Sequence, residues 1–475
     1  MADTSPLLVP TDRGHAGSPR SRPWWLLGLL SVAQFMLVLD VTVVTVALPD
    51  ISADLTLHRG VVPWVLTAYT LAFGGLMLLG GRAADMLGAR RVLLSGLVIF
   101  VVASLVGGLA ADAAMLLAGR AAQGVGAALM SPAALSVVST IFAGKDRARA
   151  LGVWAAVGGA GSALGVILGG LLTSGPGWRW VFFINVPTGL ALLVLLPLVL
   201  PANRPRRAGT VDVAGALSVT LATGAAIYGL INAGGHGWFA VSTLVPLAVA
   251  VLLYGVFVAV ERAAATPLMP LRVLTRRPVV AGVLLMLVAT GLLVGAFFLG
   301  SFYLQRLHGY SAAGTGLAFL PIALGTIIGA HGGSRAVTKV DRRALAAGSL
   351  ALVAAGCGVA AAAGGPVSLV VGLSVAAIGV GAAMVTAVTA ALTAVTPSEA
   401  GTRSGVVNTF HELGGALGVA VLSTVAATDV TGEIGTAGVT LAFVVAAVTA
   451  AAAAVLSTFV VPAGVAPADA PRPIH

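Results

Sequence analysis

The stretch from residue 81 to residue 110 reads GRAADMLGARRVLLSGLVIFVVASLVGGLA. Three arginines lie in its first eleven residues, whereas no residue from Val92 to Ala110 is charged. An α-helix needs about twenty consecutive apolar residues to cross the hydrocarbon core of a bilayer. The stretch therefore predicts a basic loop followed by a membrane-spanning helix.

The rest of the chain repeats this pattern. Of its 475 residues, 58% are hydrophobic and 9% are charged, and the mean hydropathy is +1.04, whereas about 25% of the residues of a soluble domain are charged. Apolar runs predict about fourteen spans, near residues 24–48, 60–80, 91–110, 114–136, 149–172, 180–200, 213–233, 242–261, 279–302, 315–332, 344–364, 367–392, 405–426 and 437–461. Runs of this length indicate helices rather than the alternating strands of about ten residues in a membrane barrel. We expect an all-α polytopic membrane protein.

The distribution of basic residues predicts the orientation of the chain. All but four of the 26 Lys and Arg residues fall in the N-terminal tail, in every second loop or near the C-terminus. The exceptions are Arg59, Arg179 and Arg306 in the alternate loops and Arg120 inside a span. Because basic loops stay on the cytoplasmic side, we predict a bacterial inner-membrane protein with both termini cytoplasmic. The net charge of +10 is then an orientation signal and requires no nucleic-acid partner.

An internal repeat divides the predicted spans into two sets of six. Residues 80–91 begin with two glycines and end with two arginines, and residues 332–343 do the same. Parallel repeats around a central cavity are one plan of membrane transporters. The predicted organisation is a disordered cytoplasmic tail at 1–22, a six-helix bundle at 23–201, two inserted helices at 202–262, a second six-helix bundle at 263–461 and a cytoplasmic tail at 462–475.

Several functional classes lack the residues that they require. The single cysteine, Cys357, lies in an apolar run and supplies neither an intrachain disulfide nor a metal site. The sequence contains neither the Gly-x4-Gly-Lys-Ser/Thr loop of ATP-driven pumps nor the His-Glu-x-x-His motif of zinc proteases. We therefore predict no enzymatic activity, no cofactor and no metal. The expected partners are a small molecule, protons and the lipid bilayer, and a monomer is expected.

Glycines and charged residues mark two candidate gating segments. The loop between spans 2 and 3 carries Gly81, Asp85, Gly88, Arg90 and Arg91. In this loop Gly88 permits a tight turn, and Asp85 is suited to pair with one of the arginines or with a helix N-terminus. The fifth span carries Gly152, Gly161, Gly165, Gly169 and Gly170. Such glycines let helices approach closely and slide. The alternatives are a plain basic loop and ordinary helix packing.

Two residues of opposite charge lie at similar predicted depth. Asp40 lies about 13 Å from Pro49 at the outer end of span 1, and Arg120 lies about 12 Å from Asp112 at the outer end of span 4. Charged side chains inside a span are costly and are functional candidates. We hypothesise that the two pair while Asp40 is ionised and that protonation of Asp40 releases Arg120. A structural role for Asp40 alone is the alternative.

The second half contains another candidate for proton coupling. His411 and Glu412 lie with Asn408 on a polar stripe of span 13, and both can titrate near neutral pH in a suitable environment. The alternative is that Glu412 lies close enough to the cytoplasmic end to be hydrated.

These segments resemble those of a known family. The loop at 81–91, the segment Leu116-x3-Arg120-x2-Gln123-Gly124-x-Gly126, the glycines of span 5 and the segments 39–49 and 178–189 are similar to signatures of the major facilitator superfamily. The match is to its fourteen-helix drug:proton antiporters. Val166 replaces a usual proline, Thr45 an asparagine, and His411-Glu412 an Arg-Gln pair. The resemblance implies two six-helix bundles, two inserted helices and proton-driven export by alternating access.

Polar residues in the spans are candidates for the substrate site. They are Gln34, Thr42, Thr45, Tyr69, Tyr303, Gln305 and Asn408. A few polar groups in an apolar cavity suit small hydrophobic or amphipathic compounds, cations among them. We therefore expect a proton-coupled exporter of drugs or antibiotics. A dedicated exporter of one endogenous natural product and a facilitator or uniporter without proton coupling are the alternatives.

Overall fold

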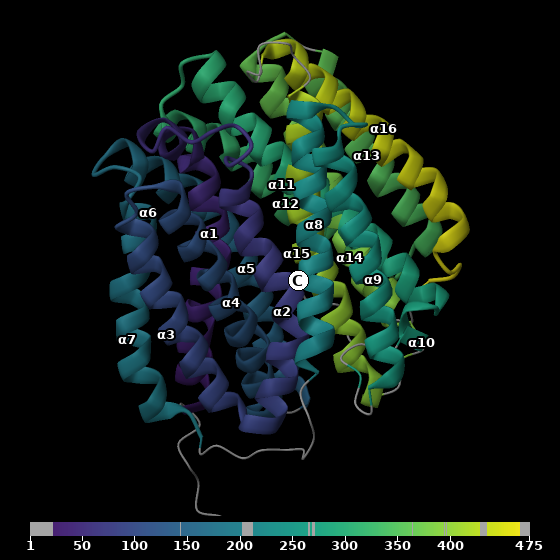
Figure 1. Cartoon of the computed structure of the whole chain (residues 1–475). Helices are drawn as coiled ribbons and strands as arrows, with labels where there is room; N and C mark the ends of the chain where they lie inside the picture. The colour runs from purple at the N-terminus through teal and green to yellow at the C-terminus, as the bar shows by residue number, and fades with distance from the viewer. Residues whose placement is uncertain are drawn as a thin grey trace, which may run out of the picture.

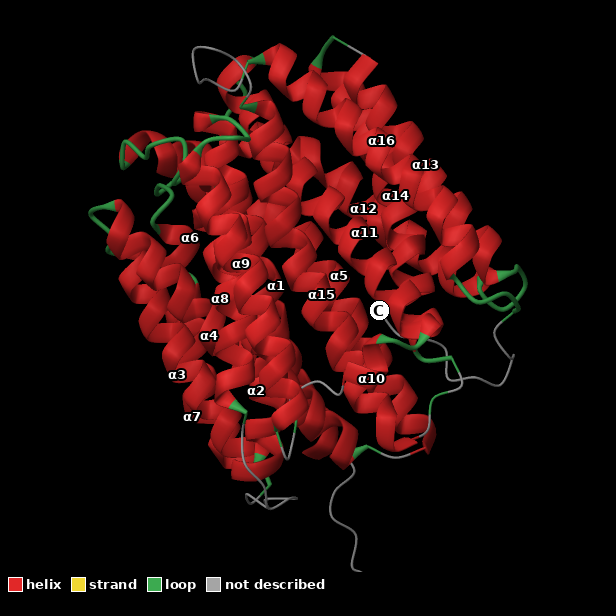
Figure 2. Ribbon diagram, turned by 45° about the vertical axis from the view of Figure 1, so that its right-hand side comes forward, coloured by secondary structure: helices red, strands yellow, loops and turns green. Residues whose placement is uncertain are grey.

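The computed structural model describes residues 22–142, 144–201, 212–264, 267, 271–362, 364–393, 395, 397–427 and 435–465. Nearly all of these residues are helical, and no strand occurs among them (Figures 1 and 2). The predicted N-terminal tail, apart from Arg22, and most of the predicted C-terminal tail lie outside the described residues. The same holds for residues 202–211, which contain three of the basic residues used to predict orientation.

The described chain contains fourteen segments long and apolar enough to cross a membrane, which confirms the predicted number. The helices are α1 Arg22–Asp54, α2 Trp64–Leu87, α3 Ala89–Gly108, α4 Ala113–Ile141, α5 Gly144–Ser174, α6 Trp180–Phe183, α7 Asn185–Val199, α8 Val213–His236, α9 Val241–Ala263, α10 Leu271–Leu274, α11 Arg277–Phe302, α12 Ala312–Ala336, α13 Arg342–Ala362, α14 Pro366–Ala391, α15 Pro397–Ala426 and α16 Thr436–Val460. Helices α6 and α7 together make one span, and a π-helical turn, η1 Tyr303–Leu307, extends α11.

The first helix is longer than predicted. The sequence suggests an end at Leu48, before Pro49, but α1 continues to Asp54. A proline inside a helix removes only one backbone donor, and Ile51 in the following turn is 0% exposed, so this turn still packs against the protein. The helix therefore continues past Pro49.

Helix contacts follow the same order in two halves of the molecule. In the first half, α1 to α7, helix α1 packs on α5, α4 packs on both α2 and α3, and α3 packs on α7. In the second half, α11 to α16, the matching contacts are α11 with α15, α14 with α12 and α13, and α13 with α16. Helices α8 and α9 pack on each other, and α8 also contacts α2 and α15 at the boundary between the halves (Figure 1).

Two antiparallel helix pairs, α2 with α15 and α5 with α12, join the halves. Glycines allow close approach in both pairs. A Cβ atom at Gly316 of α12 would overlap the Val166 carbonyl oxygen of α5, and one at Gly170 would lie 2.6 Å from the Ala312 carbonyl oxygen. A Cβ atom at Gly74 of α2 would lie 2.7 Å from the Glu412 Cβ atom of α15. Backbone contact of this kind requires residues without side chains.

Candidate functional site

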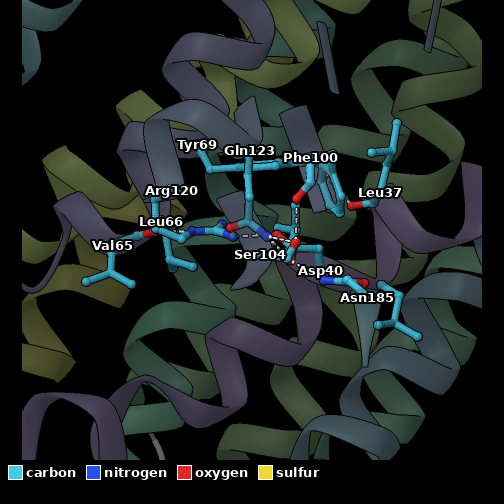
Figure 3. Close-up of polar contacts among 12 residues, drawn as sticks. Leu37, Asp40, Val65, Leu66, Tyr69, Phe100, Ser104, Arg120, Gln123 and Asn185 are labelled. Atoms are coloured by element: carbon cyan, nitrogen blue, oxygen red, sulfur yellow. Dashed lines mark hydrogen bonds and ion pairs between the residues drawn. The ribbon is translucent and has the colours of Figure 1, made fainter. Parts of the chain in front are cut away.

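A buried network of polar side chains surrounds Asp40 in the first half (Figure 3). Its Oδ2 atom accepts a hydrogen bond from Arg120 Nη1. Its Oδ1 atom accepts from Gln123 Nε2 and from Asn185 Nδ2, each at 3.0 Å. These donors come from α4 and α7, whereas Asp40 lies on α1. A carboxylate has about four acceptor positions, so three helices converge on one nearly saturated group.

Arg120 is held by contacts of several kinds. Its Nε atom donates to the Val65 carbonyl oxygen of α2 at 2.8 Å, and Nη1 also donates to Gln123 Oε1 at 2.9 Å. The guanidinium carbon lies 4.5 Å from the centroid of the Tyr69 ring, a cation–π geometry. Its Nη2 atom is buried and has no hydrogen-bond partner in the described structure. One nitrogen of the guanidinium group, with its two N–H donors, is therefore without an acceptor among the described residues.

Local sequence explains how these groups meet. Gln123 follows Arg120 by three residues, so both side chains lie on one face of α4. A Cβ atom at Gly124 would overlap the Tyr69 carbonyl oxygen, so α4 lies against the backbone of α2. This close packing brings the guanidinium group of Arg120 over the ring of Tyr69.

The charge pair is sealed inside the first half. The side chains of Asp40 and Arg120 are both 0% exposed. Removing one partner of a buried pair leaves a charge that neither water nor a counterion stabilises, at a cost of about 3–5 kcal/mol. Protonation of Asp40 would therefore leave Arg120 as an uncompensated buried cation. The arrangement can link uptake of one proton to movement of an arginine.

The pair predicted from equal depth is formed in the structure, but three of its neighbours received no role from the sequence. Gln123 and Asn185 lie in segments that carry the family resemblance, and Ser104 accepts from Gln123 Nε2 at 2.8 Å. All three are buried polar residues within spans. The sequence signal that could have assigned them a role was a polar side chain inside a predicted span, because such a side chain needs a hydrogen-bond partner.

His411 and Glu412 lie apart from this network, on α15. Their closest side-chain atoms, His411 Nε2 and Glu412 Oε1, are 3.9 Å apart, and the side chains are 37% and 15% exposed. Glu412 lies near the middle of the span Thr402–Ala426 and against Gly74 of α2. Glu412 lies ten residues from the start of this span, and its side chain is partly exposed. It lies where the two halves meet.

The predicted substrate residues come from both halves and differ in exposure. Tyr69 and Thr45 are buried in the first half, whereas Tyr303 is buried in the second. The remaining four are the half-buried Gln34, Thr42 and Gln305 and the exposed Asn408. Thr42 Oγ1 donates to the Leu39 carbonyl oxygen at 3.0 Å, and Gln34 Oε1 is a buried atom without a described partner.

The gating segments have definite partners. Gly88 has φ 91°, in the left-handed region that glycine favours. Asp85 forms no ion pair with either arginine within the described residues. Arg90 instead donates to the carbonyl oxygens of Pro197 at 3.0 Å and Leu200 at 3.2 Å, at the end of α7. Helix C-termini attract cations and offer unpaired carbonyl oxygens, which explains why Arg90 binds there. The side chain of Arg91 is exposed.

The glycines of span 5 face different neighbours. Gly161, Gly165 and Gly169 pack on α1, and Gly170 packs on α12. Gly152 and Gly81 are half-buried. In the part of the chain that the structure describes, no three His, Cys, Asp or Glu side chains lie close enough together to hold a metal ion.

The fold and this site define a polytopic helical membrane transporter. Two helix bundles meet along glycine-lined contacts, and one of them encloses a charge pair. A family model described as Major Facilitator Superfamily matches residues 30–419. The chain belongs to this superfamily.

Named relatives and solved structures resemble the chain over most of its length. A cephamycin export protein of Amycolatopsis lactamdurans is 40% identical over 416 residues, which cover 86% of each chain. A puromycin resistance protein of Streptomyces alboniger is 37% identical over 425 residues, 88% of this chain and 84% of the relative. The crystal structure of a bacterial homologue of the human lysosomal transporter Spinster has a TM-score of 0.64 at 19% identity and covers 94% of this chain and 98% of the homologue. At this identity the last likeness shows the fold alone.

Proposed function

We propose that this chain is a proton-coupled antiporter that exports small hydrophobic or amphipathic compounds, antibiotics among them, by alternating access. Membership of the superfamily and two relatives described by antibiotic resistance or export support the cargo class. The observation that carries the proton coupling is the fully buried Asp40–Arg120 pair. A carboxylate in such a place changes its surroundings greatly when it takes up a proton.

The coupling step follows from the contacts of the pair. While Asp40 of α1 is ionised, it holds Arg120 and Gln123 of α4 and Asn185 of α7. A proton on Asp40 removes its negative charge, and Arg120 then turns to its remaining acceptors, the Val65 carbonyl and Gln123 Oε1. The contacts between α1, α4 and α7 loosen, which favours a different packing of the first half. No cargo needs to touch Asp40 for this step.

The orientation proposed from the basic residues places Arg90 toward the cytoplasm. We call the end of the molecule that carries Asp54, Arg179 and Arg306 the Arg306 end; it is uppermost in Figure 1, where α6 lies. In this proposal the Arg306 end faces the exterior. Glu412, at the boundary of the halves, is then suited to attract cationic cargo or to carry a second proton.

Two narrower functions remain as alternatives. A dedicated exporter of one natural product is favoured by relatives whose descriptions each mention a single antibiotic. A uniporter without proton coupling would need the buried pair to be purely structural.

Transport by purified protein in sealed vesicles tests these proposals. Vesicles with an acidic interior receive puromycin, a cephamycin or the lipophilic cation ethidium on the outside. Antiport predicts accumulation above the external concentration, loss of accumulation when a protonophore collapses the gradient, and release of protons that depends on the compound. Equilibration without a gradient would indicate uniport, and no flux of any compound would contradict export. Transport of one compound alone would favour the dedicated exporter.

A further inference from the structure

The two halves are joined by polar contacts at one end of the molecule. Between described residues, three hydrogen bonds cross from the first half to the second, and all three lie at the Arg306 end. Gln305 Nε2 donates to the Val46 carbonyl oxygen at 2.8 Å, and Arg306 Nη2 donates to the Pro49 carbonyl oxygen at 2.8 Å. The third joins the backbone N–H of Ala313 to Ser174 Oγ at 2.9 Å.

The turn of α1 around Pro49 presents two carbonyl oxygens, those of Val46 and Pro49, to the second half. Pro49 has no N–H group for the Thr45 carbonyl, so this turn lacks one backbone hydrogen bond of the helix. Each carbonyl oxygen has two lone pairs, so it can accept a bond from outside the helix. Val46 and Pro49 are three residues apart and therefore lie on one face of α1. Because Val46 is 0% exposed, its carbonyl receives this bond from protein.

The donors lie on an unusual turn. Residues Tyr303–Leu307 form a π-helical turn at the end of α11, and such turns are rare and often occur at functional sites. Ser301 Oγ accepts from Gln305 Nε2 at 3.1 Å, which fixes the amide. The Tyr310 N–H donates to the Leu304 carbonyl at 2.9 Å, and Gly309 with φ 68° allows the chain to turn back. The turn is thus held from both sides, with Gln305 and Arg306 adjacent.

We propose that Gln305 and Arg306 are positioning residues of the transport cycle that hold the Arg306 end closed by donating to the Val46 and Pro49 carbonyls of α1. Both bonds join opposite halves, so they exist only while this end is closed. Separation of the halves would leave the carbonyls of α1 to water. The pair therefore biases the equilibrium between closed and open states at this end without touching Asp40 or Arg120.

This inference rests on the proposed alternating access but makes a claim of its own about the closed state. Glycine packing of α5 on α12 also closes the Arg306 end, so loss of the two bonds shifts the equilibrium and does not abolish closure. A net hydrogen bond in a protein changes an equilibrium by about two- to tenfold, and more when the donor is charged. We expect the larger effect from Arg306.

Distances between pairs of spin labels, measured by double electron–electron resonance in lipid nanodiscs, test the proposal. The single native cysteine is removed as Cys357→Ser. One label pair replaces the exposed His58 and Tyr310 at the Arg306 end, and another replaces the exposed Leu87 and Val340 at the opposite end. The protein without further changes should give mainly a short distance for the first pair.

Gln305→Glu replaces the donor by an acceptor of nearly the same size, and Arg306→Met keeps length without a donor. Each should raise the ratio of long to short distances at the Arg306 end by about two- to tenfold, and the double variant by more. Arg306→Lys keeps a donor and should restore most of the closed population. The control is Arg179→Met, which breaks the 2.7 Å ion pair with Asp54 inside the first half and should leave the distances unchanged.

Unchanged distances in the double variant would overturn the proposal, and so would an equal shift in Arg179→Met. The readout does not require transport. If the distances respond as expected but vesicles show no flux, the proposed function fails and the assignment of Gln305 and Arg306 stands. If vesicles transport cargo but the distances do not respond, the proposed function stands and the assignment of Gln305 and Arg306 fails.

Discussion

The guanidinium group of Arg120 on α4 binds the carboxylate of Asp40 on α1. The two residues are eighty positions apart in the sequence. Both side chains are completely buried, and Gln123 contacts both of them. The charges therefore neutralise each other inside a single bundle, away from the boundary between the halves. A change in either charge must be transmitted through helix packing.

Replacement of Asp40 by asparagine should stop proton-driven transport. Asn keeps the size but loses the charge, so Arg120 becomes a buried cation without a counterion, at a cost of about 3–5 kcal/mol. We expect compound-dependent proton release in vesicles to fall at least about tenfold, the change that about 1.4 kcal/mol produces in a rate. Asp112→Asn, at the exposed start of α4, is the matched control. Normal accumulation and proton release by Asp40→Asn would refute the proposed coupling.

Tyr69 should act through its ring rather than its hydroxyl. The ring lies under Arg120, whereas the hydroxyl makes one long bond, 3.4 Å, to the Leu37 carbonyl oxygen. Tyr69→Leu should lose a cation–π contact worth about 0.5–2 kcal/mol, which would lower the melting temperature and slow transport. Tyr69→Phe should retain most of the thermal stability and most of the transport rate. Thermal unfolding in detergent and vesicle flux measure the difference, and equal loss in the two variants would assign the effect to the hydroxyl.

Close packing of α5 on α12 should not tolerate a methyl group at Gly316. The added Cβ atom would overlap the Val166 carbonyl oxygen, so the helices must move apart. We expect Gly316→Ala to reduce transport severalfold and to lower thermal stability by about 1–3 kcal/mol, as other overpacked sites do. Gly332→Ala on the same helix is the control, because a Cβ atom there meets nothing within 4 Å. Equal behaviour of the two variants would show that this contact does not limit the cycle.

Glu412 should matter most for positively charged cargo. It is a half-buried acid at the contact of α15 with α2, and neutralising it removes an attraction for cations at a partly desolvated position. Glu412→Gln should raise the KM for ethidium about tenfold or more, while uptake of an uncharged compound changes by less than about twofold. His411→Gln is the neighbouring control. An equal loss for charged and uncharged cargo would assign Glu412 to proton transfer instead.

Local features of the chain were sufficient to predict the spans. In a bilayer, the backbone N–H and C=O groups of each apolar run of about twenty residues must form hydrogen bonds within that run. Its helical form therefore does not depend on distant residues. The end of the first span was placed at Leu48, where the apolar run stops, whereas helix α1 continues to Asp54. Equal depth along two helices was likewise enough to predict that Asp40 and Arg120 pair, since depth depends only on rise per residue.

Partners that depend on helix rotation could not be predicted in this way. Asp85 was expected to pair with an arginine of its own loop or with a helix N-terminus, but Arg90 reaches the end of α7. Gln305 was expected to line the substrate site, but in this conformation its amide binds α1. In both cases several partners lie within reach of a long side chain, and the choice depends on how whole helices are turned.

The sequence by itself determined fourteen helices and a buried charge pair, because the bilayer imposes strict rules on length and charge along a single chain. Only the tertiary structure decided that Asn185 and Gln123 complete the site of Asp40, and that Gln305 and Arg306 join the halves. These contacts depend on the rotation and tilt of packed helices. Glycine positions allow that packing but do not specify it, since many small residues permit many close approaches.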